Sequence, residues 1–114
     1  MAKSDAEALL RYADMFAALG SGARLRILRL LLALHPQGMA AGEVQAELGI
    51  PASTLSHHLE KLKNQGLVTV RRKGTFLWYS ANTEALQDLL AFLLGECCKR
   101  SKALKPEVII RLCR

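Results

Sequence analysis

The sequence predicts a mainly α fold with a small β-hairpin, and three observations support this class. Apolar residues recur at helical spacing in segments that Gly or Pro residues separate. Two runs rich in β-branched and aromatic residues, 68–73 and 75–80, flank Gly74 as in a hairpin. The 114 residues are 51% hydrophobic, so a core can form without disulfides. We therefore expect a single domain over residues 1–114, with residues 99–114 as a C-terminal extension.

Five helices are expected, and each has a local start or stop signal. Ser21 can cap the second helix, and Gly49 can end the third in a left-handed conformation. Pro51 suits the first turn of the fourth helix, which Gly66 ends. The expected spans are 6–18, 23–34, 41–48, 51–65 and 83–98 or beyond.

The fourth helix begins with an unusual cluster of hydroxyl and imidazole side chains. Its apolar residues Leu55, Leu59 and Leu62 share one face, so the polar ones project elsewhere. Two short helices joined by a tight Gly-containing turn predict a helix-turn-helix, and a basic hairpin directly after it predicts a wing. The candidate DNA-binding residues are Ser53, Thr54, Ser56, His57, His58, Lys61 and Lys63 on the helix, and Arg71, Arg72 and Lys73 on the wing.

Charge distribution favours the same partner. The net charge is +6. From 57 to 73 the bases Lys61, Lys63, Arg71, Arg72 and Lys73 face one acid, Glu60. A localised basic region of this kind is typical of proteins that bind double-stranded DNA, although charge alone would favour a solvated surface.

Several classes of function find no support in the sequence. We expect no signal peptide, and the most apolar stretch, 27–34, is too short for the ~20 residues of a membrane span. We expect no membrane partner and a cytoplasmic location, where Cys97, Cys98 and Cys113 would be reduced. No nucleotide loop, zinc-protease motif or nucleophile elbow is present, so neither an enzyme nor an organic cofactor is expected.

Two stretches resemble the ArsR/SmtB family of metal- and metalloid-responsive repressors. "STLSHHLEKLKNQGLVTVRRKGTFLWYS" is similar to the winged-helix core of that family, and "MFAALGSGARLRILRLLL" to its preceding segment. The match spans about residues 12–95. This resemblance implies a homodimer built through the first and last helices. It also implies binding to an imperfect inverted repeat in operator DNA and release by an inducer.

The sequence departs from the family pattern in the helix that would contact bases. Pro51 replaces the usual capping Ser, so the helix should begin without a side-chain cap. Ala52 replaces a residue that is commonly polar, which removes one base contact. The operator sequence therefore does not follow from the resemblance.

The family's two best-known inducer sites are missing here. The segment before the DNA-contacting helix, "AAGEVQAELG", has no Cys for the common arsenic site, and "TEALQDLLAFLLGECCKR" has no His for the zinc site. The vicinal Cys97 and Cys98, with Cys113 beyond them, resemble another arsenic-responsive branch whose thiolates lie at the end of the dimerisation helix. That resemblance implies arsenite or antimonite as the inducer.

The chemistry of sulfur supports this ligand set independently. Thiolate is a soft ligand that selects thiophilic ions, and Lys99, Arg100 and Lys102 would lower the thiol pKa values. Alternatives remain: Cys97 could extend the apolar stripe as a buried hydrophobe, and Cys113 could be a tail thiol. The same cysteines could also serve a redox- or sulfide-responsive repressor, or be inert in a constitutive DNA-binding module.

Overall fold

The structure is a computed structural model that describes residues 3–96. Its elements follow the expected order, with one short strand added before the third helix. They are α1 (Lys3–Leu19), α2 (Gly22–Ala33), β1 (Met39–Ala40), α3 (Ala41–Leu48), α4 (Ala52–Asn64), β2 (Val68–Lys73), β3 (Phe76–Ala81) and α5 (Thr83–Glu96).

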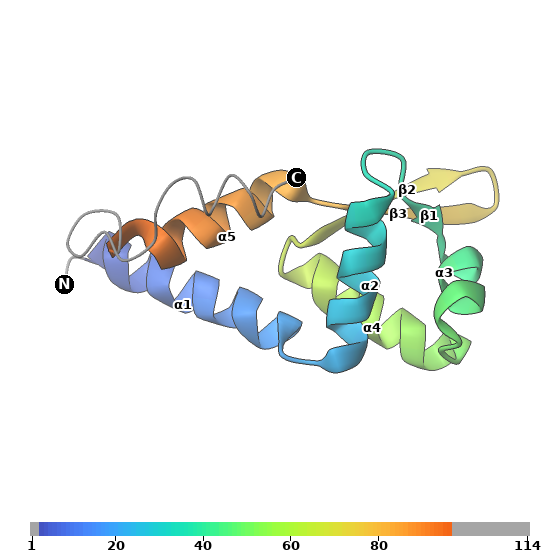
Figure 1. Cartoon of the computed structure of the whole chain (residues 1–114), viewed down its shortest axis with the longest axis horizontal. Coiled ribbons are helices and arrows are strands. Elements are labelled where there is room, and N and C mark those ends of the chain that lie inside the picture. Colours follow the sequence, from blue (N-terminus) through green and yellow to red (C-terminus); the bar gives the residue numbers. More distant parts are fainter. Residues whose placement is uncertain (1–2, 97–114) are drawn as a thin grey trace.

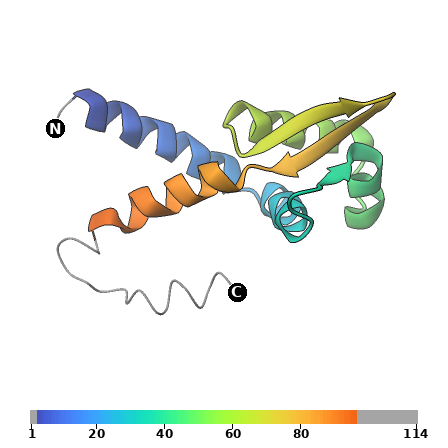
Figure 2. The same cartoon turned by 90° about the horizontal axis from the view of Figure 1, so that it is seen from above.

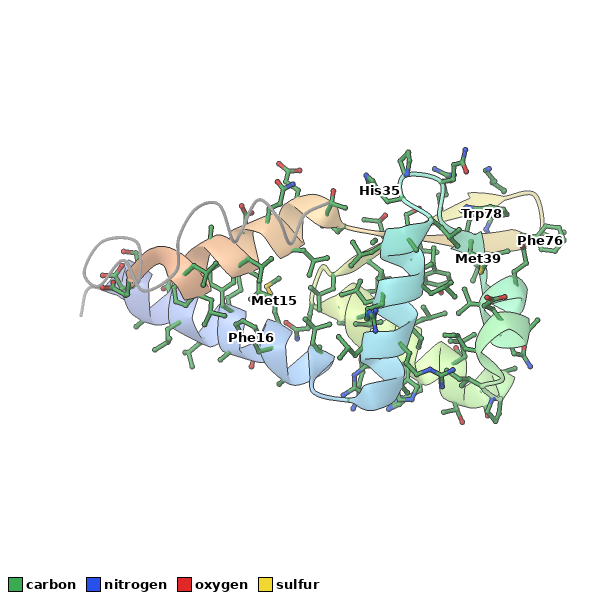
Figure 3. The ribbon with its side chains drawn as sticks, in the orientation of Figure 1. Met15, Phe16, His35, Met39, Phe76 and Trp78 are labelled. Carbon is green, nitrogen blue, oxygen red and sulfur yellow. The ribbon has the colours of Figure 1, made fainter. Side chains whose placement is uncertain are left out.

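The molecule has two parts. α2, α3, α4 and the sheet form a compact body, and α1 and α5 lie side by side and extend away from it (Figures 1 and 2). Met15 of α1 is 3% exposed and joins these two helices to the main core (Figure 3). Within residues 3–96, no helix is long and apolar enough to cross a lipid bilayer.

The core lies mainly between α2, α4 and the sheet. Ile27 and Leu31 are fully buried, whereas Leu25 and Leu32 of the same helix remain 46% and 36% exposed. The apolar stripe of α2 is therefore wider than the face that α4 and the sheet cover, which is centred on Ile27 and Leu31. The other fully buried large side chains are Val44, Leu59, Leu62, Leu67, Val68 and Leu89.

The predicted hairpin is present but belongs to a three-stranded antiparallel sheet with the order β1-β3-β2. β2 has the expected bounds, and β3 begins at Phe76, one residue later than predicted. β1 was not predicted, because two residues are too few to show a strand period. It pairs Met39 with Tyr79 and Ala40 with Trp78.

The helix boundaries confirm the expected local signals. The Ser21 hydroxyl accepts a hydrogen bond of 3.3 Å from the Arg24 backbone N–H and caps α2. Gly49 ends α3 with a φ of 67°, the left-handed conformation that glycine adopts without strain. α1 begins at Lys3, earlier than the apolar pattern indicates.

Candidate nucleic-acid interface

α3 and α4 form the predicted helix-turn-helix, and α4 presents a polar face to solvent. Leu55, Leu59 and Leu62 are at most 2% exposed and hold α4 against the core. The predicted DNA-contacting residues on the opposite face are exposed, with one exception discussed below. The exposed ones are Ser53, Thr54, Ser56, His57, Lys61 and Lys63.

α4 begins without a side-chain cap, as expected from Pro51. This N-cap residue forms no side-chain hydrogen bond, and its carbonyl accepts the Leu55 N–H at 2.8 Å. The first N–H groups of a helix have no intrahelical partner, and the helix dipole is positive there. The start of α4 therefore favours an anionic group such as a DNA phosphate.

His58 is the predicted contact that differs from the rest, because it is only partly exposed. Its Nδ1 lies 3.2 Å from Nη1 of Arg24 on α2. Burial lowers the pKa of His58, and the charges of Arg24, His57 and Lys61 lower it further. His58 is therefore biased toward the neutral imidazole, whereas His57 is open to solvent.

The two lysines of α4 have different surroundings. Lys63 Nζ lies 3.3 Å from a carboxylate oxygen of Glu60 one turn earlier, so part of its charge is balanced within the helix. Lys61 lines a crevice of about 300 Å³ between α1, α2 and α4. Within residues 3–96, Lys61 forms no ion pair with an acidic side chain.

The wing carries its three predicted cations on exposed positions, but they are not equivalent. The guanidinium of Arg71 donates to the Gln37 carbonyl at 3.3 Å. Lys73 Nζ lies 4.5 Å from the ring centroid of Trp78, a cation–π contact. Arg72 forms no hydrogen bond or ion pair with the described part of the chain. Arg72 is thus the wing cation with the fewest internal contacts.

The base of the wing is fixed by one carbonyl oxygen. Gln37 accepts hydrogen bonds from Arg71, from the indole N–H of Trp78 and from Ser80. Gln37 lies in the loop between α2 and β1, so this oxygen holds the hairpin to the body. Sequence patterns do not predict this role, because a backbone carbonyl carries no residue signature.

The tip of the wing is apolar as well as basic. Phe76 is 64% exposed (Figure 3). It pairs with Lys73 across the hairpin. The residues that the sequence did not identify as part of this region are Arg24, Gln37, Phe76 and Trp78. Only Phe76 and Trp78 had a visible signal, as aromatic residues beside the basic run.

The predicted inducer residues Cys97, Cys98 and Cys113 lie outside the described residues. Among residues 3–96, no group of three or more His, Cys, Asp and Glu side chains is placed to hold a metal ion.

Comparison with known proteins supports a regulatory role. Residues 19–71 match a family model described as a helix-turn-helix domain. The chain is 36% identical over 82 residues to the transcriptional repressor SdpR of Bacillus subtilis, covering 72% of this chain and 88% of SdpR. It is 30% identical over 93 residues to the proposed arsenical resistance operon repressor ArsR2 of Halobacterium salinarum, covering 80% of this chain and 77% of that one.

A solved structure shows the same architecture in a dimer. The homodimeric winged helix-turn-helix domain of a possible ArsR-family regulator from Mycobacterium bovis superimposes with a TM-score of 0.69. The two chains are 28% identical, and the match covers 85% of this chain and 89% of that one. The arrangement of α3, α4 and the wing is therefore that of a DNA-binding regulator and not of an enzyme.

Proposed function

Because the chain belongs to the ArsR family of winged helix-turn-helix regulators, we propose that it is a homodimeric repressor released from operator DNA by trivalent arsenic or antimony. The structural neighbour from Mycobacterium bovis is a homodimeric DNA-binding domain, which supports binding to DNA as a dimer. The identity of the inducer is what we propose for this chain, together with the residues that bind DNA and the metalloid.

One observation carries the DNA-binding part of the proposal. The polar start of α4 is exposed while Leu55, Leu59 and Leu62 anchor its back, and the basic wing projects from the same body. An α-helix fits the major groove, where hydroxyl and imidazole groups can donate to and accept from base edges. Arg72 and its neighbours on the wing would contact the backbone or minor groove beside it.

The dimer would form through α1 and α5. Leu10 of α1 and Leu90 and Leu93 of α5 are 67%, 51% and 54% exposed. These two helices extend from the body side by side, with their axes close together (Figures 1 and 2). Large exposed apolar side chains on neighbouring helices are typical of protein–protein interfaces. A twofold dimer would present two α4 helices to the two halves of an inverted repeat.

Thiolates placed just after α5 support a metalloid inducer. Cys97 and Cys98 follow Glu96, the last described residue of α5, directly in the sequence. Cys97, Cys98 and Cys113 would hold the ion, because a sulfur-only ligand set suits thiophilic trivalent arsenic. The proposed role of ArsR2 in arsenical resistance is consistent with this inducer.

Contacts between the helices give a route from α5 to α4. The Tyr12 and Phe92 rings stack, so α5 is tied to α1, and α1 contacts α2 and α4 in turn. A change in the packing of α5 would alter the separation of the two α4 helices. Half-sites lie ~34 Å apart along DNA, so a small rotation weakens binding. Typical coupling of about 1–3 kcal/mol corresponds to roughly 5–150-fold in affinity.

The test begins with a duplex selected from a randomised library by the reduced protein. Fluorescence anisotropy with this duplex would measure affinity with and without arsenite. We expect arsenite to lower affinity, and native mass spectrometry to show one arsenic per subunit. Loss of three protons per arsenic would include Cys113 in the site, and loss of two would leave it out.

One double variant and two treatments of the unaltered protein separate the alternatives. Cys97→Ser/Cys98→Ser should bind DNA normally and ignore arsenite, and continued release would refute the metalloid site. If the unaltered protein ignores arsenite but releases DNA after peroxide or persulfide treatment, the cysteines serve a redox or sulfide sensor instead. If neither treatment changes affinity, the protein is a constitutive DNA-binding module.

A further inference from the structure

Within residues 3–96, Arg24 is the residue of α2 whose side chain forms hydrogen bonds to both α1 and α4. The cap of α2 holds the backbone of Arg24 in place, because the Arg24 N–H donates to the Ser21 hydroxyl. From this position Nε donates to the Ala18 carbonyl in the last turn of α1. Nη1 lies 3.2 Å from Nδ1 of His58 on α4.

The contact with α1 satisfies a group that its own helix leaves free. The last carbonyls of a helix have no intrahelical partner, and the C-terminal end of the dipole is negative. The last turn of α1 contains no basic residue. Arg24 supplies both the hydrogen-bond donor and the positive charge from the neighbouring helix, so it is held to the end of α1.

The contact with α4 restricts the chemistry of His58. A guanidinium has five N–H donors and no acceptor, and it stays protonated in proteins. A hydrogen bond to Nδ1 therefore requires that Nδ1 accept, which places the imidazole proton on Nε2. Burial and the charges of Arg24, His57 and Lys61 also disfavour a second proton, because all of them lower the pKa of His58.

The contact between Arg24 and His58 lies beside a crevice where α1, α2 and α4 meet. Arg24 and Lys61 line the crevice of about 300 Å³ where α1, α2 and α4 meet, together with Asp14, Ala17, Ala18, Asn64 and Gln65. Asp14 is the acid in this crevice. His58 follows His57 in the exposed part of α4, one turn after Thr54. A shift of α1 at this point would therefore be passed to the DNA-contacting face.

We propose that Arg24 is a positioning residue for operator binding: it ties His58 to the end of α1 and presents it as a neutral imidazole with the proton on Nε2. The Nε2–H group then remains available as a donor. DNA contact by His58 rests on the proposed function, whereas the tautomer and the link to α1 do not.

The first measurement is made on the unaltered protein without DNA. Nitrogen-15 NMR of the histidines distinguishes the two neutral tautomers. We expect the Nε2–H tautomer of His58 to predominate at pH 7.5. Predominance of the Nδ1–H tautomer would overturn the proposal, and so would a rapid average of both. This result does not depend on whether arsenite or any operator is correctly assigned.

The second measurement uses Arg24→Gln, with Arg29→Gln as the matched control. Arg29 is an exposed residue of α2 that forms no hydrogen bond or ion pair with residues 3–96. Arg24→Gln should raise the pKa of His58 toward its ordinary value and lower DNA affinity by about 2-fold to 10-fold, the effect of one hydrogen bond. Arg29→Gln should leave the pKa of His58 unchanged.

A double-mutant cycle tests whether Arg24 acts through His58. In a His58→Ala background, Arg24→Gln should cost little further affinity, because the shared contact is already absent. An equal loss in both backgrounds would show that Arg24 acts on DNA binding by another route. Sedimentation and thermal unfolding of each variant would confirm that the dimer is folded. If Arg24→Gln does not fold, the tautomer measurement and Arg24→Lys, which keeps the charge but not the planar fork, decide the question.

Discussion

Tyr12 of α1 and Phe92 of α5 stack with their ring centroids 4.5 Å apart and their planes inclined by 27°. The two residues come from opposite ends of the described chain, and their contact joins the first helix to the last. A stacked aromatic pair contributes about 0.5–1.5 kcal/mol beyond the area it buries. The pair therefore holds α1 and α5 as one unit on which a partner subunit can pack.

We expect a charge among the exposed leucines of α1 and α5 to separate the subunits. Leu90→Lys would bury an unpaired ammonium at the proposed interface, which costs far more than the lost apolar contact. Analytical ultracentrifugation at micromolar concentration should show mainly monomer. Leu32→Lys, on an exposed part of α2 outside the proposed interface, should remain dimeric. A dimeric Leu90→Lys protein would place the interface elsewhere.

Removal of Arg72 should reduce the salt dependence of DNA binding. A cation that neutralises a phosphate releases a counterion, and each such contact adds about 0.9 to the slope of log affinity against log salt. Arg72→Ala should thus lower the slope by about 0.9 per subunit. Titrations at several salt concentrations would measure it. Arg29→Ala removes the same charge from α2 and should leave the slope as it was.

Stability should depend on pH through His58. The pKa of His58 is lowered below its ordinary value of 6.5, first by burial and then by Arg24. The unfolded chain therefore binds more protons than the folded one between these two pKa values. The contribution of neutral His58 to the free energy of unfolding is present above pH 6.5, and it is lost as the pH falls through the pKa of His58 in the folded protein. Urea unfolding at fixed protein concentration should show this loss, and His58→Gln should reduce it. His35→Gln, at an exposed position that is not among the groups lowering the pKa of His58, should retain it.

Gly38 should be intolerant of substitution because of its place at the base of the wing. Its φ is 76°, and a Cβ there would overlap the Tyr79 carbonyl oxygen. Gly38→Ala should destabilise the protein by about 1–3 kcal/mol from backbone conformation alone. The overlap would add to this and displace Gln37 from Trp78. Gly42→Ala is the control, because a Cβ in that helix meets nothing within 4 Å. Thermal unfolding and Trp78 fluorescence would report both effects.

Local patterns in the sequence were sufficient for most of the fold. The spans of α3 and β2 agree with prediction, and Ser21 and Gly49 act as the expected helix boundaries. These features depend on residues a few positions apart, so their signals lie within a short window. The same is true of α4, where Leu55, Leu59 and Leu62 recur at helical spacing and leave the polar residues outside.

Contacts between distant residues could not be predicted in this way. β1 forms because Met39 and Ala40 pair with β3. Two residues alone show no strand period in the sequence. The apolar stripe of α2 is wider than its buried face, so periodicity did not show that Leu25 would stay exposed. Only the packing of neighbouring elements selects which part of such a stripe is covered.

The sequence by itself thus determined the helices, the hairpin and the polar, basic region that we propose contacts DNA, since each is encoded in local spacing and charge. The tertiary structure decided how these residues differ from one another. It places Arg24 against His58 across 34 positions and Trp78 against Gln37 across 41. It also pairs Lys63 with Glu60 and leaves Arg72 without an internal partner in the described chain. Hydrogen bonds and burial depend on separation in space, and separation in space is set by how the elements pack.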